Sequence, residues 1–292
     1  MRLISAKSIL GLSALLLTAA CTDEQAENPA DGARPIAFTP AAETRAAVEG
    51  SSLPSGSSFN VWGWYGTGNE INKNVFDGNT VTESNGTWGY TGGTQYWIPG
   101  MTYNFYGVYP ADYGRCDNSG VITVDNFDCS NAVDLMTAMH TREYNGTNAD
   151  AVNMQFKHEL ARVKVSVESN GATVDGLKVY GVGYKGNFNS GNTPKWTVTE
   201  TAAEESTLLS GKTAQDMLLL PATDLTNAKL KVTYHYGSDA SATRTDEASL
   251  AIAEGWTAGQ QYHYKVSIVA GKLTITVTVV EWNEEDTSVS WG

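Results

Sequence analysis

The stretch QYHYKVSIVAGKLTITVTVV, residues 261–280, decides the fold class. On both sides of the Ala270-Gly271 dipeptide, apolar or aromatic residues take every second position, which is the period of a β-strand. The first arm carries Tyr262, Tyr264, Val266 and Ile268, and the second carries Leu273, Ile275, Val277 and Val279. Because Gly adopts the backbone conformations that tight turns require, the dipeptide predicts a hairpin of two antiparallel strands.

Strand-like alternation recurs through the rest of the chain, and no segment keeps a helical period for three turns. The strands predicted from it cover residues 59–65, 101–109, 161–168 and 229–236. Turn sequences rich in Gly and Asn separate them, and the one at Ser169-Asn170-Gly171 divides the body into two parts of similar size. We therefore predict an all-β protein with two tandem antiparallel β-sandwich domains, residues 36–170 and 171–292.

Charge and composition exclude several classes of protein. The 292 residues carry a formal net charge of −13, and Lys and Arg form no cluster beyond pairs, so the chain lacks the clustered cations that a nucleic-acid backbone requires. Hydrophobic residues make up 41% of the chain and charged residues only 17%, which excludes a disordered protein. We expect a folded, acidic protein that does not bind nucleic acid.

The first residues form an export signal rather than part of the fold. Arg2 and Lys7 precede an apolar run at residues 9–17, and small residues follow it up to Cys21. This order predicts a secretory signal peptide at residues 1–20, because a membrane-spanning helix needs about 20 apolar residues. The small, polar and Pro-containing residues 21–35 predict a flexible tether.

Two other cysteines, Cys116 and Cys129, flank a segment whose sequence predicts a turn followed by a strand. Disulfides are typical of exported proteins, so the pair is a candidate disulfide. Sequence spacing alone does not show that the two side chains meet.

Two strings resemble active-site motifs but lack the context that the chemistry needs. Residues 181–186 match GxGxxG, yet a polar loop follows them where a helix N-terminus is required, so we interpret them as turn glycines. His158-Glu159 begins like a zinc-protease motif, but Arg162 stands where the second His belongs. We therefore predict no catalytic residues, no metal site and no cofactor. An enzyme would need a carboxylate pair assembled from distant parts of the chain.

Several ordered segments resemble bacterial fimbrillin-like proteins. Residues 96–110, YWIPGMTYNFYGVYP, are similar to their YW-P-x-x-x-Y-x-F-x-A-x-Y-P segment, and residues 156–165, FKHELARVKV, to their F-x-H-x-L-A-[KR]-V-x-V strand. Residues 218–221 and 255–262 resemble the C-terminal half of the family. The small residues before Cys21 resemble a lipoprotein lipobox, although Thr18 stands where that pattern usually has Leu. The resemblance covers nearly the whole chain.

The resemblance implies a particular biology. The chain would be a surface lipoprotein of Bacteroidales type, lipidated on Cys21 and held in the outer membrane, with two transthyretin-like sandwiches. It would act as a subunit or anchor of type V pili, or as a related adhesin. Its partners would be other pilus subunits, with surface ligands of the host or of other bacteria. Ordinary cleavage beside an incidental Cys21 is the alternative to lipidation.

The resemblance also implies that the subunits assemble by β-strand addition. An Arg-specific protease removes an N-terminal strand, and a strand of another subunit pairs with the main-chain groups thus freed. Arg45, within ETRAA, is the candidate cleavage site and Arg34 is the second; in a lipid-retaining anchor neither is cut. Residues 272–280 are a candidate donor strand or an ordinary C-terminal core strand.

A surface glycan-binding lipoprotein is the alternative function. The indoles of Trp62, Trp64, Trp88 and Trp97 would then form an aromatic platform, because aromatic faces offer sugar rings a large apolar area. Burial of the same residues in the sandwich cores is the competing interpretation.

Overall fold

The computed structural model describes residues 32–42, 53–205, 210–211, 214–269 and 272–282. These residues form nineteen β-strands and one 3-10 helix, η1 (Cys129–Asn131). In this part of the chain no helix is long and apolar enough to cross a membrane. The prediction of an all-β fold is confirmed, whereas the transthyretin-like detail stays a prediction.

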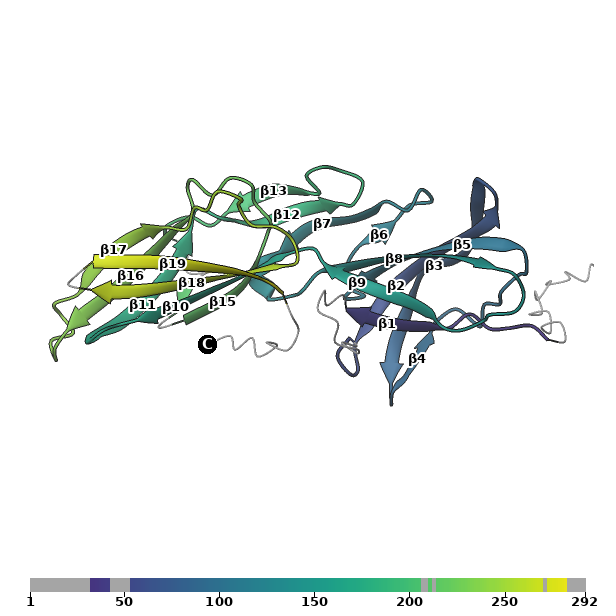
Figure 1. Ribbon diagram of the computed structural model, residues 1–292, viewed down its shortest axis with the longest axis horizontal. Helices are drawn as coiled ribbons and strands as arrows, with labels where there is room; N and C mark the ends of the chain where they lie inside the picture. Colours follow the sequence, from purple (N-terminus) through teal and green to yellow (C-terminus); the bar gives the residue numbers. More distant parts are fainter. Residues whose placement is uncertain (1–31, 43–52, 206–209, 212–213, 270–271, 283–292) are drawn as a thin grey trace, which may run out of the picture. The chain divides into compact units, whose positions relative to one another are not determined.

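The first sheet contains seven strands in the order β1-β9-β8-β5-β2-β3-β4. Their bounds are β1 (Phe38–Ala42), β2 (Ser58–Thr67), β3 (Glu70–Ser84), β4 (Thr87–Tyr90), β5 (Met101–Tyr109), β8 (Met136–Tyr144) and β9 (Val152–His158). The strand predicted at 101–109 is thus confirmed, and β2 contains the one predicted at 59–65. β1 runs parallel to β9, with Phe38 opposite Val152, and Figure 1 shows the two strands side by side. The other described ladders of this sheet are antiparallel.

The two edges of this sheet approach each other. The Ile36 N–H donates to the Gln95 carbonyl at 2.8 Å, and the Trp97 N–H donates to the Arg34 carbonyl at 2.9 Å. The Tyr90 hydroxyl, on β4, donates to the Ile36 carbonyl at 3.0 Å. The segment before β1 is therefore bound to the chain that follows β4, and the folded body begins at Arg34, within the predicted tether.

The curled sheet encloses a core rich in aromatic rings, which we call the first core. Its buried members are Ile36, Phe38, Leu53, Phe59, Val61, Phe76, Val81, Trp97, Tyr103, Phe105, Met136, Ala138, Tyr144, Val152, Met154 and Phe156. The Phe38 ring lies among four others, with centroid distances of 5.2 Å to Phe76, 5.6 Å to Phe105, 5.9 Å to Tyr90 and 6.3 Å to Phe59. All four pairs meet edge to face, an arrangement that aromatic quadrupoles favour.

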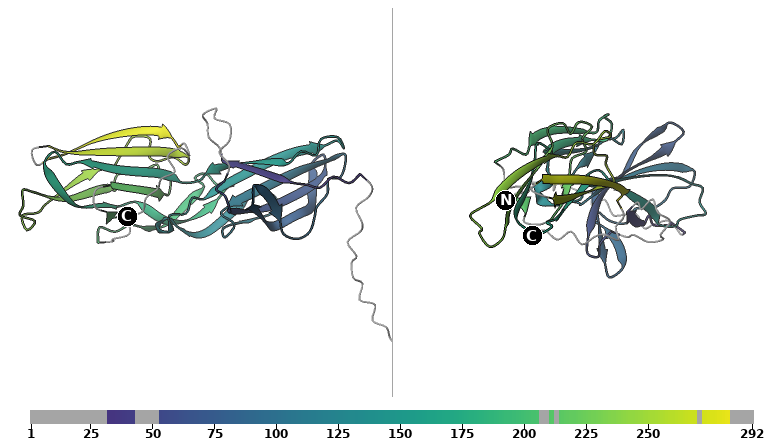
Figure 2. Two further views of the ribbon diagram at one scale, coloured as in Figure 1. Left: turned by 90° about the horizontal axis from the view of Figure 1, so that it is seen from below. Right: turned by 60° about the vertical axis from the view of Figure 1, so that its left-hand side comes forward.

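Three four-stranded sheets surround a second core. Their orders are β15-β10-β18-β19, β14-β11-β16-β17 and β13-β12-β7-β6. The bounds are β6 (Arg115–Cys116), β7 (Ile122–Asp128), β10 (Ala161–Glu168), β11 (Ala172–Tyr180), β12 (Gly183–Asn189), β13 (Trp196–Thr201), β14 (Ser210–Gly211), β15 (Ala214–Leu219), β16 (Lys229–Tyr236), β17 (Arg244–Ser249), β18 (Gln260–Val269) and β19 (Lys272–Glu281). Figure 2 shows β18 and β19, in yellow, layered over the green strands of a second sheet.

The hairpin from which the fold class was predicted is present as β18 and β19. Tyr262 pairs with Val279 and Ile268 with Leu273, so the alternation of the two arms is in register. The predicted turn at 270–271 lies outside the described residues. β18 also pairs with β10, and this ladder is parallel, which the expectation of antiparallel sandwiches did not include.

The predicted domain boundary at residue 170/171 is a turn within the second core. Asn170 and Gly171 have φ values of 47° and 90°, as tight turns require, and the Asn170 amide donates to the Ser267 hydroxyl at 2.8 Å. β10 and β11, on either side of this turn, both contribute to the second core. β7 also contributes to the second core, and β8 and β9 then return to the first, so the chain passes between the two cores more than once before this turn. The Asn-Gly sequence indicates a tight turn, and the division into domains at residues 36–170 and 171–292 stays a prediction.

Alternation along residues 161–168 is typical of a strand with one solvated face and places Arg162 on that face, but Arg162 is fully buried. Its Nε donates to Asp216 Oδ1 at 3.0 Å and its Nη2 donates to Asp216 Oδ2 at 2.8 Å, a bidentate pair between β10 and β15. A buried guanidinium needs such a partner, because an unpaired charge in the interior is strongly unfavourable. Alternation showed the two faces of β10 but not that both are covered.

Replacement of Phe38 tests how much the first core depends on β1. In the chain from residue 22, we expect Phe38→Ala to lower the free energy of unfolding by about 3–5 kcal/mol, because it removes the ring from a packed aromatic cluster. Denaturant unfolding measures this change. Thr39→Ala, an exposed neighbour on the same strand, is the control with an expected loss below about 0.5 kcal/mol. Equal losses in the two variants would contradict the assignment.

Candidate functional site

β1 occupies one edge of the first sheet, and it is the element on which the candidate site is built. Ile36, Phe38 and Pro40 point into the first core, whereas Ala37 and Thr39 are exposed. The Val152 N–H of β9 donates to the Ala37 carbonyl at 2.7 Å. β1 therefore joins the fold through one strand ladder and one row of buried side chains.

The surface beneath β1 is apolar. Phe59, Phe76 and Phe105 lie within ring contact of Phe38 and are at most 1% exposed. The Ala37 carbonyl bonds to β9, so in this parallel ladder the main-chain nitrogen of Pro40 faces the open edge, where the lack of an N–H is typical of an edge strand. Burial of Ile36, Phe38 and Pro40 adds side-chain contacts to the ladder between β1 and β9. An extended segment with apolar side chains at alternate positions is complementary to such an arrangement.

The two candidate cleavage sites stand on opposite sides of β1. Arg34 precedes β1. Its side chain is exposed, and its carbonyl accepts a hydrogen bond from the Trp97 N–H. Arg45 follows β1 and lies outside the described residues, as does Cys21. Only a cut after β1 separates this strand from the body of the protein.

β19 occupies an edge of another sheet. Its inward side chains, Leu273, Ile275 and Val277, are half-buried and pack against the second core, while Val279 is 50% exposed. Ten residues of β19 pair with β18. Within this chain the predicted donor segment 272–280 is a strand of its own sheet.

A comparison with protein families shows to which family the chain belongs. A family model described as fimbrillin-like matches residues 44–282. The chain belongs to the fimbrillin-like family. The resemblance found in the sequence motifs is thus confirmed, and the family implies a protein of the cell surface that is structural rather than enzymatic.

Solved structures share the fold of this fimbrillin-like chain. A protein of Bacteroides uniformis described as a cell adhesion protein is 18% identical, with a TM-score of 0.60, and the match covers 87% of this chain and 100% of the other. A fimbrial protein of Bacteroides vulgatus is 15% identical, with a TM-score of 0.58 and coverage of 86% and 100%. At such identities the likeness shows the fold alone. No curated protein matches the chain.

The four tryptophans proposed as a glycan platform do not form one. Trp62 and Trp64 are buried in the second core and Trp97 in the first, each at most 7% exposed. Trp88 is half-buried against the first core, with its ring centroid 5.7 Å from that of Phe59. One face of β2 packs in the first core and the other in the second. The alternation of its residues did not indicate this.

The predicted disulfide is wrong, because Cys116 and Cys129 are both free cysteines. Cys116, on β6, pairs with Ile122 at the start of β7, whereas Cys129 follows the last residue of β7. The seven residues of β7 extend over roughly 20 Å, and a disulfide requires Cα atoms within about 7 Å. Burial raises the pKa of the Cys116 thiol to about 12, with a smaller contribution from Asp117, and burial also raises the pKa of Cys129.

The sequence motifs gave no indication of β1. The segment IAFTPAA contains only two large apolar residues, Ile36 and Phe38, and its Pro and Ala residues are not typical of strands. The spacing of Ile36 and Phe38 by two positions was the available signal. It was too short to separate a strand from the end of the tether.

Thiol titration tests the state of the cysteines. In the fimbrillin-like chain from residue 22, we expect slow reaction of the folded protein with a disulfide reagent at pH 8, because a raised thiol pKa leaves little thiolate. After unfolding without reductant, two thiols per chain should react at once. Absence of reactive thiols in the unreduced, unfolded chain would show that the two cysteines form a disulfide after all.

Proposed function

We propose that this chain is a structural pilus subunit in which a strand of another subunit replaces β1 after proteolysis, or a pilus anchor that is not cut and retains β1. The observation that carries the proposal is the position of β1, an edge strand whose Phe38 lies at the centre of the first core. Membership of the fimbrillin-like family supports it.

The geometry favours Arg45 over Arg34 as the site of cleavage. A cut after Arg34 leaves β1 attached to the rest of the chain through Ala42, so the strand would stay in place. A cut after Arg45 leaves β1 held only by non-covalent contacts. Displacement then exchanges one set of buried side chains for another, which requires less free energy than unfolding.

The incoming strand must satisfy two requirements. It has to pair with β9 through its main chain, and it has to present an apolar side chain where Phe38 lay, since an empty position would leave a cavity among four aromatic rings. An alternating apolar strand of a neighbouring subunit meets both requirements. Residues 272–280 have such alternation, but their ten-residue ladder with β18 supports the interpretation as a core strand of their own fold.

Attachment to the cell completes the proposal. Lipidation of Cys21 would hold the unprocessed chain in the outer membrane, and cleavage after Arg45 would release the body from this lipid. An anchor would instead retain both the lipid and β1. Processing at Arg45 therefore separates a polymerising subunit from an anchor within the same proposal. Burial of three of the four candidate platform tryptophans gives the glycan-binding alternative no support.

Conservative substitution of the two arginines tests the proposal. The lipid-free precursor, as wild type, Arg45→Lys and Arg34→Lys, is incubated with an Arg-specific protease. We expect wild type and Arg34→Lys to acquire a new N-terminus at Ala46 and to form SDS-resistant ladders, whereas Arg45→Lys remains uncut there and monomeric. Intact-mass measurement locates the cut, and electrophoresis without boiling detects the ladders.

Two results would count against a polymerising subunit. Wild-type protein that is cut after Arg45 but forms no ladder would show that the removal of β1 does not lead to assembly. Protein that resists cleavage at Arg45 would leave only the anchor form of the proposal, which predicts capture of a cleaved subunit by the intact chain. Absence of that capture would refute the anchor as well.

A further inference from the structure

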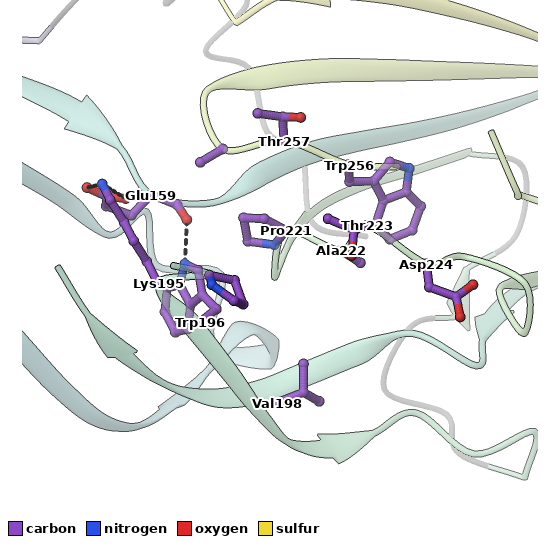
Figure 3. Close-up of a pocket in the computed structure, with 12 residues that line it drawn as sticks. Glu159, Lys195, Trp196, Val198, Pro221, Ala222, Thr223, Asp224, Trp256 and Thr257 are labelled. Carbon is purple, nitrogen blue, oxygen red and sulfur yellow. Dashed lines mark hydrogen bonds and ion pairs between the residues drawn. The ribbon is translucent and has the colours of Figure 1, made fainter. Parts of the chain in front are cut away.

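A cavity of about 480 Å³ opens beside the edge strand β13, away from β1. It is lined by Glu159, Pro194, Lys195, Trp196, Val198, Pro221, Ala222, Thr223, Asp224, Trp256, Thr257 and Ala258. Four segments far apart in the sequence supply these residues, and Figure 3 shows how they lie around the opening. Cavities of this size accommodate small organic molecules.

The cavity exists because one layer of the fold ends before the other. Over β12, the Leu220 side chain packs so closely that a Cβ added to Gly186 would come within 2.9 Å of it. Beyond Leu220 the chain is only partly buried at Pro221 and Ala222, and β13 is exposed after Trp196. Two hydrogen bonds between Ala222 and Trp256, of 2.7 and 2.9 Å, fix the opposite wall. The cavity is therefore preformed.

The interior of the cavity offers apolar surface and few free polar groups. The Trp196 indole donates to the Glu159 carbonyl at 2.8 Å, and the Trp256 indole donates to the Tyr264 hydroxyl at 2.9 Å. Both carboxylate oxygens of Glu159 lie 3.1 Å from the Lys195 ammonium. Because these donors and acceptors are already engaged, the walls suit an apolar ring better than a hydroxyl-rich sugar.

The ionisable residues that line the cavity carry a net negative charge. Glu159 and Lys195 form an ion pair and neutralise each other, and Figure 3 places Asp224 at the other end of the lining residues. Hydrogen bonds from Thr226 keep the pKa of Asp224 below its ordinary value, so this carboxylate is ionised at neutral pH. Glu159, Lys195 and Asp224 are the ionisable lining residues, and together they leave one negative charge.

From these observations we propose that the cavity binds an aromatic cation, an apolar ring that carries one ammonium or guanidinium group. The ring lies between the walls formed by Trp196, Val198 and Trp256. The cationic group lies at the rim near Asp224. This site is separate from β1, and binding there does not depend on pilus assembly.

Three indoles that differ in one group test the proposal. Tryptamine is the cation, 3-ethylindole the neutral analogue and indole-3-propionate the anion. Dissociation constants are measured by ligand-observed NMR with the folded chain from residue 22. We expect tryptamine to bind about two- to five-fold more tightly than 3-ethylindole, which is the range for one exposed charge pair, and the anion to bind most weakly.

Two matched variants assign the effect to the cavity. Asp224→Asn should abolish the preference for tryptamine and leave the binding of 3-ethylindole unchanged. Asp239→Asn is the control, because Asp239 is also exposed and accepts a hydrogen bond from the main chain two residues later, as Asp224 does, but lies outside the cavity lining. It should preserve the preference while making the same change in net charge.

A third variant blocks the opening. Val198 is 45% exposed on β13, and Val198→Trp should weaken all three indoles while the thermal unfolding temperature shows that the fold is retained. The proposal is overturned if no indole binds at millimolar concentration, if the anion binds as tightly as the cation, or if Asp239→Asn removes the preference as Asp224→Asn does.

Discussion

The contact of Phe38 with four surrounding aromatic rings is the interaction on which the first core depends. The ring comes from a five-residue strand at the edge of the sheet, although it occupies the centre of the core. Edge strands are usually the least important part of a sheet for its packing. Here the most easily detached strand supplies a central side chain, so its loss must be followed by replacement. That coupling is what makes strand exchange a physically reasonable function for this fold.

The two cores are stabilised in different ways. Phe38 meets its neighbours in the first core edge to face, whereas aliphatic side chains are the majority in the second core, where the buried Arg162–Asp216 pair joins two strands. A bidentate ion pair between β10 and β15 fixes their register more strictly than apolar contacts do, because a shift by one residue would separate the charges. The proposed exchange of β1 would leave this ion pair in place.

Local patterns were enough to predict the class of the fold and many of its strands. β5, β10 and β16 have the bounds that alternation indicated, and the β18–β19 hairpin is in the expected register. Alternation could not show which faces are covered, so it placed Arg162 on a solvated face and left the burial of Trp62 and Trp64 open. The cavity was beyond prediction, because its walls come from segments that only the folded chain brings together. Asp224 and Lys195 carry no sequence signal of this neighbourhood.

The parallel ladder between β1 and β9 also constrains how the molecule forms. A chain is made from its N-terminus, so Phe38 exists long before Val152, the residue that it must face. Closure of so long a loop is entropically unfavourable and slow compared with the pairing of neighbouring strands. β2, β3, β5 and β8 can therefore assemble while the position of β1 is still vacant. An open form without β1 is therefore accessible during biogenesis, and the proposed proteolysis would return the molecule to that form.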